Sequence, residues 1–364
     1  MKHIIIDARE SGSSTGRYID KLIENLAQLK PKYKITVLTK KKRVEYIEKV
    51  APKFKVVTTR VKFFGFAEQT TLLKQVKSLQ PDLVFFPAAQ QPILYRGKVV
   101  TTIQDLTAVR FRNPAKNWLV FTFKRWVYKG VNKIVGHRSL LLITPTEFVK
   151  DDFAKFAKVN SRKITVTHES ADKITDEPQP VEELEGKQFI MYVGRPQPHK
   201  NLGRLIDAFE ILRQKQPHLR LVLAGKKDAL YRQHQREVQK RGIKNVIFTD
   251  FVSEGQLRWL YENTAAYVFP SLSEGFGLPG LEAMIHGAPV VSSNATCLPE
   301  VYQDAALYFD PLNTEDIAEK IDHMLTDQNL RKKNIARGYQ VVKQYSWQRM
   351  ARQTLDVFNQ ALED

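Results

Sequence analysis

The chain alternates short, continuous apolar runs with longer segments in which apolar residues recur every three or four positions. Runs such as Ile4–Ile6 and Phe189–Val193 predict strands that are buried on both faces of a sheet. The segment that carries Tyr18, Leu22 and Leu26 at helical spacing predicts an amphipathic helix. Because strands and helices alternate along most of the chain, the pattern predicts an α/β fold with doubly wound parallel sheets.

The pattern divides into two similar series. In the first, strands are expected at residues 4–6, 35–38, 55–57, 81–86, 99–103 and 141–144, and helices at 18–29, 118–138 and 147–156. In the second, strands are expected at residues 189–193, 219–224, 246–248, 265–269 and 290–291, and helices at 202–215, 231–241, 254–262, 279 onward, 314–326 and 345–362. We therefore expect two Rossmann-like domains.

A polar, acidic stretch at residues 172–187 separates the two series and contains Pro178 and Pro180. It predicts a linker, with residues 1–172 as one domain and residues 173–344 as the other. Parallel sheets of this kind bind ligands beyond the carboxyl ends of their strands. We therefore expect the binding site in a cleft between two facing domains.

The composition is that of a soluble globular protein, with 43% hydrophobic and 26% charged residues in a chain of 364. The apolar runs are too short to cross a bilayer, and the first residues lack the pattern of a signal peptide. The single cysteine, Cys297, excludes an internal disulfide and fits a reducing compartment. We expect a cytoplasmic protein.

The net charge of +18 comes from the first half of the chain. Residues 1–172 contain 33 Lys and Arg against 14 Asp and Glu, whereas residues 173–364 contain 24 against 25. Residues 106–146 contain eight Lys and Arg and no acid, interleaved with aromatic residues such as Trp118 and Trp126. This mixture favours peripheral association with an anionic membrane surface. Nucleic-acid binding is less favoured, and ordinary helices with basic outer faces are the other alternative.

The stretch FPSLSEGFGLPGLE, residues 269–282, leaves a predicted strand, passes through a loop and starts a helix at Pro279. Its glycines let the backbone approach a ligand closely, and the unpaired amides of the helix N-terminus suit a phosphate. Glu274 and Glu282 can face the same site, where two carboxylates suit a polyhydroxylated ligand that carries a diphosphate. From spacing alone, loop capping by Glu274 and a dipole-favoured position for Glu282 are equally good interpretations.

Two cations follow the first strand of the second series. Arg195 and Lys200 occur in the sequence GRPQPHKN, which starts at Gly194 between that strand and its helix. The carboxyl-end rule places them beside the predicted phosphate site, where they would hold a diphosphate that leaves as an anion. The alternative is a surface cation pair that begins a helix. Gly225, after the next strand, is a weaker candidate for the same site.

The first half shows no comparable phosphate motif. Gly12 and Gly16 follow the first strand, but their spacing is not the G-x-G-x-x-G of a dinucleotide site, so no NAD site is expected. Gln104 and Asp105 end a strand, where Asp105 either orients a substrate hydroxyl or caps a helix. The chain has no D-x-D spacing and no Cys/His cluster, so no metal site is expected.

Together these features resemble the retaining nucleotide-sugar glycosyltransferases of family four, which have the two-domain GT-B fold. The resemblance covers nearly the whole chain, and its most specific feature is the pair Glu274 and Glu282, with seven residues between them. The matching segments are residues 192–195, 200–202, 269–271, 274–279, 282–284, 287–291 and 298–301 in the second half, and residues 16–18 and 105–107 in the first.

The resemblance implies that Glu274 contacts the donor sugar, Glu282 the ribose hydroxyls, and Arg195 and Lys200 the diphosphate. Backbone amides of the loop before the helix would help to hold that diphosphate. The implied residues fall into three groups: a catalytic group of Glu274, Arg195, Lys200 and Asp105; a donor site that also contains Gly16, Gly194, Gly225, Gly275, Phe276, Gly277, Leu278 and Glu282; and the acceptor-positioning residues Gln104 and Arg17.

The resemblance also implies a mechanism without an essential metal or a cofactor, the nucleotide sugar being the donor substrate. The acceptor hydroxyl attacks the face that the diphosphate leaves, and the departing phosphate takes its proton. The final segment, residues 345–364, would cross back onto the first domain. Many relatives have a histidine before Asp105, whereas this chain has Gln104, which keeps a hydrogen bond but has no cationic form. The choice of acceptor or the rate is therefore expected to differ.

We expect a hexosyltransferase of cell-envelope glycan or polysaccharide synthesis that uses a saccharide or lipid-linked saccharide acceptor. The segments 105–107 and 298–300 resemble those of polysaccharide mannosyltransferases, which favours GDP-mannose as the donor. A sugar-nucleotide epimerase of the same fold is one alternative and would convert the donor without an acceptor. A non-catalytic basic protein that binds a membrane surface is another and would show no turnover.

Overall fold

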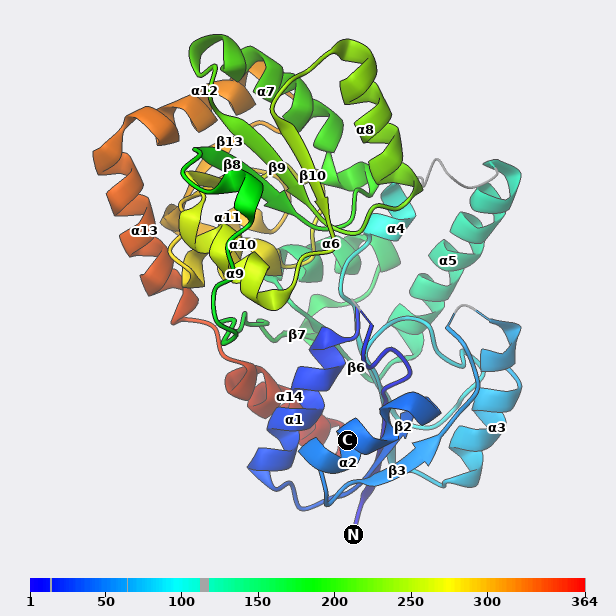
Figure 1. Ribbon diagram of the computed structural model, residues 1–364. Coiled ribbons are helices and arrows are strands. Elements are labelled where there is room, and N and C mark those ends of the chain that lie inside the picture. Colours follow the sequence, from blue (N-terminus) through cyan, green and yellow to red (C-terminus); the bar gives the residue numbers. More distant parts are fainter. Residues whose placement is uncertain (14, 64, 112–117, 364) are drawn as a thin grey trace. The chain divides into compact units, whose positions relative to one another are not determined.

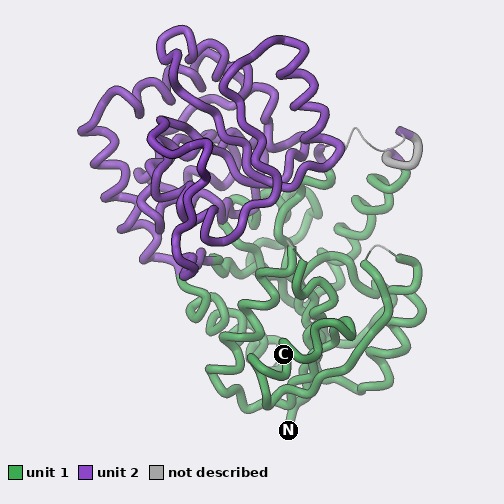
Figure 2. The backbone as a smooth tube through the Cα atoms, viewed as in Figure 1, with its two compact units in different colours: residues 1–109, 123–169, 346–364 green, residues 110–122, 170–345 purple. Residues whose placement is uncertain are grey.

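The computed structural model describes residues 1–13, 15–63, 65–111 and 118–363. The chain forms two compact units, which Figure 2 shows in different colours. The first unit contains residues 1–109, 123–169 and 346–364, and the second contains residues 110–122 and 170–345. Each unit has its own parallel sheet with helices packed on it (Figure 1).

The sheet of the first unit has seven strands in the order β3-β2-β1-β4-β5-β6-β7, and every neighbouring pair is parallel. Its central strands are completely buried, which explains their continuous apolar sequences. The strands are β1 (His3–Asp7), β2 (Lys34–Thr39), β3 (Lys55–Thr58), β4 (Leu83–Phe86), β5 (Val99–Thr102), β6 (Leu141–Thr144) and β7 (Ile164–Val166).

The last helix of the chain packs with the first unit. Helix α14 contacts α1 and strands β4 to β6, and its Phe358 ring lies 5.2 Å from that of Phe85. Tyr33 donates a hydrogen bond to Asn359 (2.5 Å). The helices of this part of the chain are α1 (Arg17–Leu29), α2 (Val44–Val50), α3 (Thr71–Ser78), α4 (Thr107–Arg110), α5 (Trp118–Arg138), α6 (Glu147–Ala157) and α14 (Trp347–Glu363).

The sheet of the second unit has six parallel strands in the order β10-β9-β8-β11-β12-β13. The strands are β8 (Phe189–Val193), β9 (Arg220–Ala224), β10 (Val246–Asp250), β11 (Ala266–Phe269), β12 (Val290–Ser293) and β13 (Ala306–Phe309). The helices are α7 (Leu202–Lys215), α8 (Ala229–Arg241), α9 (Glu254–Asn263), α10 (Leu278–Ile285), α11 (Leu298–Tyr302), α12 (Thr314–Thr326) and α13 (Gln328–Val342).

The prediction of two doubly wound parallel sheets is confirmed. The predicted linker, residues 172–187, contains only a short 3₁₀ turn, but hydrogen bonds hold it on the second unit. The amide of Ile174 donates to His286 (3.1 Å), and the amide of Gln179 donates to the Gly255 carbonyl (3.0 Å). This stretch is therefore an integral part of the second unit.

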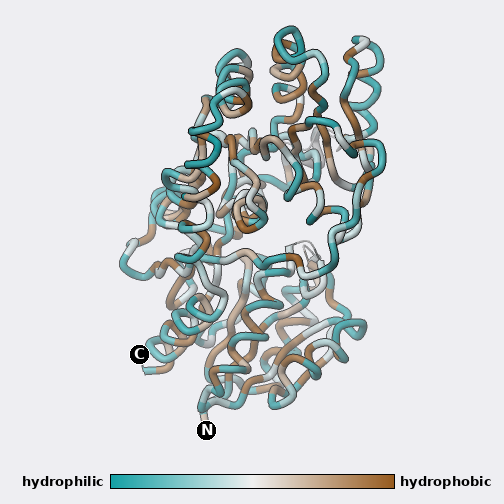
Figure 3. Tube along the Cα trace, turned by 60° about the vertical axis from the view of Figure 1, so that its left-hand side comes forward, coloured by the Kyte–Doolittle hydropathy of each residue, from teal (hydrophilic) through white to brown (hydrophobic). Residues whose placement is uncertain are grey.

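Along the helices, each turn contains both apolar and polar positions (Figure 3). Helix α1 is typical: its buried positions include Leu22, Ile23 and Leu26, which form one apolar stripe. Among the described residues, no helix combines the length and the apolar character that a bilayer-spanning segment needs.

Candidate functional site

In the second unit, the carboxyl ends of β8 and β11 lie next to each other because these two strands pair in parallel. The strand order reverses at this point, with β9 and β10 on one side and β12 and β13 on the other. Ligands of open α/β sheets bind at such a reversal, beyond the carboxyl ends of the strands. The loops that leave the two strands, residues 194–201 and 270–277, carry most of the predicted donor-site residues.

Lys200 and Glu274 form an ion pair across these two loops. Lys200 Nζ lies 2.5 Å from Glu274 Oε1, and the two side chains are only 17% and 13% exposed. The same ammonium lies 5.4 Å from the centre of the Phe269 ring. The Glu274 backbone is fixed as well, because its amide donates to Thr296 Oγ1 (3.1 Å) and its carbonyl accepts from Cys297 Sγ (3.3 Å). The fold thus brings two predicted site residues into direct contact.

Asn201 anchors the loop that carries Lys200. Its backbone is left-handed (φ 59°) and precedes α7. Its buried side-chain amide donates to the carbonyls of Pro270 (3.1 Å) and Pro311 (2.7 Å), so it joins the loop after β8 to the loop after β11. Asn201 belongs to one of the matching sequence segments, residues 200–202, and its two hydrogen bonds hold the loop that carries Lys200 beside the loop that carries Glu274.

The loop before α10 requires a glycine at position 277. Gly277 has a φ of 94°, and a Cβ atom there would lie 2.6 Å from the Tyr302 hydroxyl. That hydroxyl donates to the Gly277 carbonyl. Pro279 occupies the first turn of the helix, as predicted. The N-terminus of α10, with its positive dipole end, therefore lies at Leu278.

Glu282 lies about one turn into α10, where its Oε2 accepts a hydrogen bond from the Tyr261 hydroxyl (3.3 Å). Phe276, before the helix, is buried, and its ring packs edge-on against Tyr345 with 5.4 Å between the ring centres. The Phe276 side chain is therefore occupied by packing inside the second unit. Gly275 lies between Glu274 and Phe276 in the same loop.

The loops after β8 and β9 are held together by one tyrosine. The Tyr231 hydroxyl lies within hydrogen-bond distance of the Gly194 carbonyl oxygen (2.9 Å) and the Ala224 carbonyl oxygen (3.1 Å), which share its one proton. Gly225 has a φ of 153°, and a Cβ there would lie 2.4 Å from the Gly194 carbonyl oxygen. Arg195 follows on the same loop with an exposed side chain. Of the two predicted cations, Lys200 is therefore the one that pairs with Glu274.

His199 adds no positive charge to this region. Burial and, to a lesser extent, the charge of the neighbouring Lys200 lower its pKa to about 4, although Glu274 acts in the opposite direction. The ring is therefore neutral near pH 7. The His199 carbonyl accepts from the Leu272 amide (2.7 Å), which makes the residue another link between the two loops.

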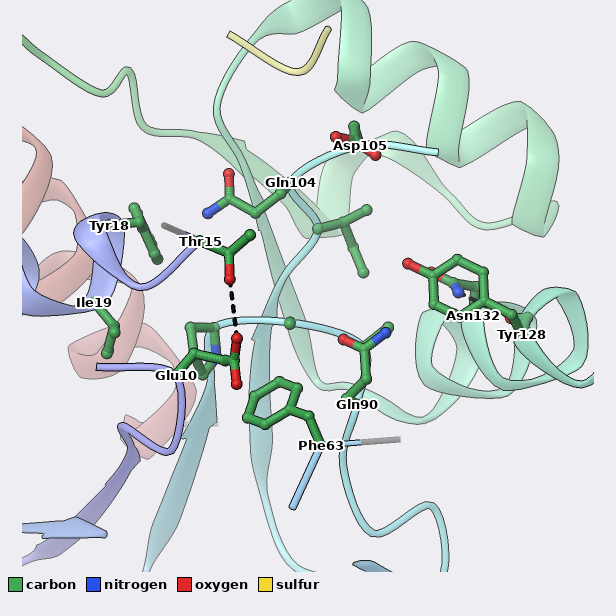
Figure 4. A pocket seen from close by; sticks show the side chains of 14 residues that line it. Glu10, Thr15, Tyr18, Ile19, Phe63, Gln90, Gln104, Asp105, Tyr128 and Asn132 are labelled. Atoms are coloured by element: carbon green, nitrogen blue, oxygen red, sulfur yellow. Dashed lines mark hydrogen bonds between the residues drawn. The ribbon is translucent and has the colours of Figure 1, made fainter. Parts of the chain in front are cut away.

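The first unit contains a cavity of about 190 Å³ beyond the carboxyl ends of β1, β4 and β5 (Figure 4). Thr15 Oγ1 donates to Glu10 Oε2 at its edge (2.9 Å). Among the described residues that line the cavity, none is Lys or Arg. The lining residues are Glu10, Thr15, Tyr18, Ile19, Phe63, Pro87, Ala88, Ala89, Gln90, Ile103, Gln104, Asp105, Tyr128 and Asn132.

A buried ion-pair network supports this pocket. Arg9 is fully buried and pairs with Asp7 (2.8 Å) and Glu68 (2.9 Å). Burial alone would lower the pKa of Arg9, but the two carboxylates outweigh it and raise the pKa. The guanidinium also donates to the Gln90 carbonyl (2.8 Å) and lies 4.3 Å from the centre of the Phe63 ring. Arg9 thus fixes two lining residues, while its charge is neutralised within the protein.

Gln104 and Arg17 share a partner that the sequence analysis missed. Glu169 follows β7 and is 5% exposed. Burial raises its pKa to about 7, although attraction to Arg17 and a hydrogen bond with Gln104 act in the opposite direction. The two residues expected to position the acceptor thus lie beside one buried carboxyl group. No local sequence pattern marks Glu169, because its burial comes from the packing of distant segments.

Asp105 has the helix-capping role considered for it, and it also lies at the pocket. Its Oδ1 accepts from the Thr107 amide at the start of α4 (2.8 Å), and its side chain also lines the pocket (Figure 4). Gly16 precedes α1 at a point of close packing, because a Cβ there would lie 1.9 Å from the Glu10 carbonyl oxygen.

Residues 15–172 match the family described as Glycosyltransferase Family 4, and residues 173–341 match the family described as Glycosyl transferases group 1. The two matches are contiguous. This chain belongs to the family-four glycosyltransferases. The resemblance deduced from the motifs around Glu274 and Glu282 is thereby confirmed.

Curated relatives of this glycosyltransferase-family chain include two bacterial mannosyltransferases. O-antigen chain mannosyltransferase B of Escherichia coli is 33% identical over 250 residues, which cover 64% of each chain. O-antigen chain mannosyltransferase RfbU of Salmonella typhimurium is 31% identical over 184 residues, which cover 50% of each chain. The chain thus spans between half and two thirds of the length of these relatives.

Solved structures establish the GT-B fold of this family member. Sucrose-phosphate synthase from Thermosynechococcus elongatus superimposes with a TM-score of 0.78 at 16% identity, over 99% of both chains. The Anabaena protein HepE, in complex with UDP and glucose, superimposes with a TM-score of 0.73 at 16% identity, also over 99% of both chains. In the described part of this chain, no three His, Cys, Asp or Glu side chains are grouped so that they would hold a metal ion.

Proposed function

We propose that this protein transfers a hexose from a nucleotide diphosphate sugar to a saccharide acceptor, with retention of the anomeric configuration. The observation that carries the proposal is the Lys200–Glu274 pair in the second unit, on the two loops that meet at the strand reversal. It combines positive charge for a diphosphate with a carboxylate for sugar hydroxyls. The N-terminus of α10 begins at Leu278, shortly after Glu274, and would add backbone amides that suit a phosphate.

On the donor side, Lys200 would bind both Glu274 and the diphosphate. An ammonium group has three N–H donors, so Lys200 can keep its bond to Glu274 and still donate to a phosphate oxygen. Arg195 is the second cation, and its exposed side chain is free of the packing that fixes Lys200. Glu282 would bind the ribose hydroxyls, with its carboxylate held by Tyr261. The glycines of the three loops, Gly194, Gly225 and Gly275, would let the donor approach the backbone.

In the proposed reaction, the bond between the anomeric carbon and the diphosphate oxygen breaks while the acceptor oxygen bonds to the same face of that carbon. The acceptor proton goes to the departing phosphate oxygen, so the step requires no protein base, metal or cofactor. Negative charge grows on the diphosphate as its bond breaks. Lys200, Arg195 and the amides of α10 stabilise this growing charge more than they stabilise the bound donor, which lowers the barrier.

On the acceptor side, we propose that the pocket of the first unit binds saccharide. Its polar lining consists of hydroxyl, amide and carboxylate groups, which hydrogen-bond to sugar hydroxyls. Asp105 would orient the attacking hydroxyl, while Gln104 and Arg17, both beside Glu169, would position the acceptor. Gly16 would line the site at the start of α1.

GDP-mannose is the proposed donor, because the curated relatives that match this chain include mannosyltransferases of bacterial O-antigen chains. Cell-envelope polysaccharide synthesis is the corresponding process. We also propose that the protein works in the cytoplasm, peripherally attached to the inner face of the membrane through residues 106–146. Residues 112–117 of that segment lie outside the described residues.

A nucleotide-sugar panel tests the function directly. GDP-mannose should raise the melting temperature, because a ligand that binds only the native state stabilises it by about 2.7 kcal/mol at a hundred times its Kd. UDP-glucose is the comparison donor. Incubation of the protein with the binding donor and a lipid-linked saccharide should then lengthen the acceptor by one hexose, detected by mass spectrometry, and NMR of the product should show the anomeric configuration of the donor.

Lys200→Ala should abolish both the thermal shift and the transfer, whereas Lys240→Ala, on the exposed side of α8, should leave both in place. Conversion of the donor without any acceptor would support an epimerase instead. No thermal shift with any nucleotide sugar would contradict the proposal.

A further inference from the structure

Helix α5 has two chemically different faces. On the inner face, Val131 and Val135 pack against the hydrophobic core of the first unit, and the Asn132 amide donates to the Tyr128 carbonyl (2.8 Å). Tyr128 and Asn132 also line the pocket of that unit (Figure 4). The inner face of α5 is therefore a wall of the proposed saccharide site.

The outer face of the same helix exposes large apolar side chains to solvent. Phe123 is 70% exposed, Trp126 73%, Val127 49% and Ile134 40%. Their spacing of three, four and seven residues puts them on one side of an α-helix. Asn132 and Val135 lie on the opposite side. These four residues form a continuous outer stripe, which the protein leaves uncovered although burial of such side chains is favourable.

Positive charge borders the outer stripe. Lys124 and Lys133 are exposed and Lys129 is half-exposed, and the sequence from 106 to 146 contains no acid. Arg125 is not part of this border, because its Nε donates to the Val109 carbonyl (2.6 Å). Basic residues beside exposed aromatic and aliphatic ones match an anionic lipid surface, where the apolar groups enter the headgroup region. Nucleic acid fits less well, since Val127 and Ile134 offer no surface on which bases stack.

We propose that the outer stripe of α5 lies in the interface of an anionic membrane while its inner face holds the acceptor saccharide. A helix with its side chains is about 10–12 Å across. The pocket is then held about one helix diameter from the lipid headgroups, so its acceptor is a saccharide carried by a membrane lipid. This inference rests on the proposed function for the acceptor, but membrane binding is measured independently of turnover.

Sedimentation with vesicles tests the membrane contact. The protein should bind vesicles of phosphatidylcholine and phosphatidylglycerol in equal amounts at low salt, and binding should weaken as salt rises. The triple variant Phe123→Ser, Trp126→Ser and Ile134→Ser should bind at least about tenfold more weakly, the scale of one buried apolar side chain. Lys124→Glu with Lys129→Glu should weaken binding as well. Phe251→Ser, an 81% exposed aromatic of the second unit, is the matched control and should bind like the parent.

Trp126 provides a direct readout. Its fluorescence should be quenched by vesicles that contain brominated lipid, and Trp126→Phe should remove most of the quenching. Absence of binding to these vesicles at low salt would overturn the proposal, and so would equal binding by the triple variant. Loss of binding to duplex RNA rather than to vesicles in the same variants would instead assign the stripe to nucleic acid.

The link to the acceptor has its own measurement. The triple variant should lower kcat/KM for a lipid-linked acceptor in vesicles several-fold more than for a water-soluble saccharide. Asn132→Ala should lower both to a similar extent, because it changes the pocket itself. If the triple variant affects both acceptors equally, the stripe does not present the acceptor. If no acceptor reacts at all, the proposed function fails while the vesicle experiments still decide the membrane contact.

Discussion

Glu169 lies buried beside Arg17 and Gln104, and burial raises its pKa to about 7. A glutamate in an unfolded chain titrates near pKa 4.3. Between these two values the folded protein binds more protons than the unfolded chain, so stability falls as the pH rises. The contribution of the neutral Glu169 carboxyl to the free energy of unfolding is thus fully present at low pH and is lost as the pH rises through about 7.

Glu169→Gln should remove this dependence, since an amide does not ionise. The variant should gain stability relative to the parent as the pH rises from about 5 to about 8, by on the order of 2 to 3 kcal/mol. Urea unfolding at a series of pH values measures the difference. Glu185→Gln, at an exposed position, is the control for the effect of removing a glutamate charge from the surface. A difference between Glu169→Gln and the parent that stays constant with pH would contradict this account.

The Lys200–Glu274 pair is a second residue-scale case, because its two side chains are mostly shielded from solvent. Either Lys200→Met or Glu274→Gln leaves the other residue without its counter-charge. Each substitution should lower the free energy of unfolding by about 1–3 kcal/mol. The double variant should lose less unfolding free energy than the sum of the two single variants. A double-mutant cycle measured by denaturant unfolding should give a coupling energy of about 0.5–3 kcal/mol. Strict additivity would mean that the two groups do not interact in solution.

At the scale of elements, α10 shows how a helix start is fixed from outside the helix. Its first turn depends on the left-handed backbone of Gly277 and on Tyr302, whose hydroxyl contacts the Gly277 carbonyl. The sequence predicted the start of this helix from Pro279 and the glycines before it. Tyr302 was not among the predicted residues, since it comes from another helix, α11, that packs under the loop.

Gly277→Ala should therefore displace the start of α10. The new Cβ meets the Tyr302 hydroxyl at 2.6 Å, and the φ of 94° is unfavourable for alanine. We expect a lower melting temperature and loss of stabilisation by the donor nucleotide, both measured by thermal shift. Tyr302→Phe should restore part of the loss by removing the clashing oxygen. Gly203→Ala, in α7 with nothing within 4 Å of its Cβ, is the control and should be neutral or stabilising by about 0.5 kcal/mol.

At the scale of the whole molecule, the last helix belongs to the unit that the first half of the chain builds. Helix α14 covers α1 and the central strands of the seven-stranded sheet, and Phe358 is fully buried against Phe85. The strand that Phe85 occupies is separated from α14 by more than two hundred residues of sequence, including the entire second sheet. The first unit is therefore complete only when the end of the chain is present.

Phe358→Ala should destabilise the first unit by about 3–5 kcal/mol, the usual cost of a large cavity. Hydrogen exchange followed by mass spectrometry should show faster exchange in β4 and β5 and unchanged exchange in β8. Phe209→Ala, a fully buried position of α7, should give the opposite pattern. Equal loss of protection in both sheets after Phe358→Ala would show that the two units unfold together.

The parts of the fold that the sequence predicted well are those with strong local patterns. The central strands are continuous apolar runs, and α5, α6, α7 and α12 show clear helical periodicity or caps. Helix α13 was missed because its buried positions include Asn334 and Gly338, which give no apolar stripe. Strand β13, at the edge of its sheet, was missed because it is only partly buried and follows α11 closely. Strand β7, the corresponding edge strand of the other sheet, was also missed, because it has only three residues.

The sequence by itself determined the alternation of strands and helices, the glycine and proline positions at the start of α10, and the residue types of a diphosphate site, because these depend on near neighbours in the chain. Only the tertiary structure decided that Lys200 rather than Arg195 pairs with Glu274, that Glu169 is buried beside Gln104, and that Arg9 is neutralised beside the pocket. Such pairings depend on which loops meet at the ends of parallel strands. The local sequence does not show which loops meet, because burial and ion pairing arise only when distant segments pack together and exclude water.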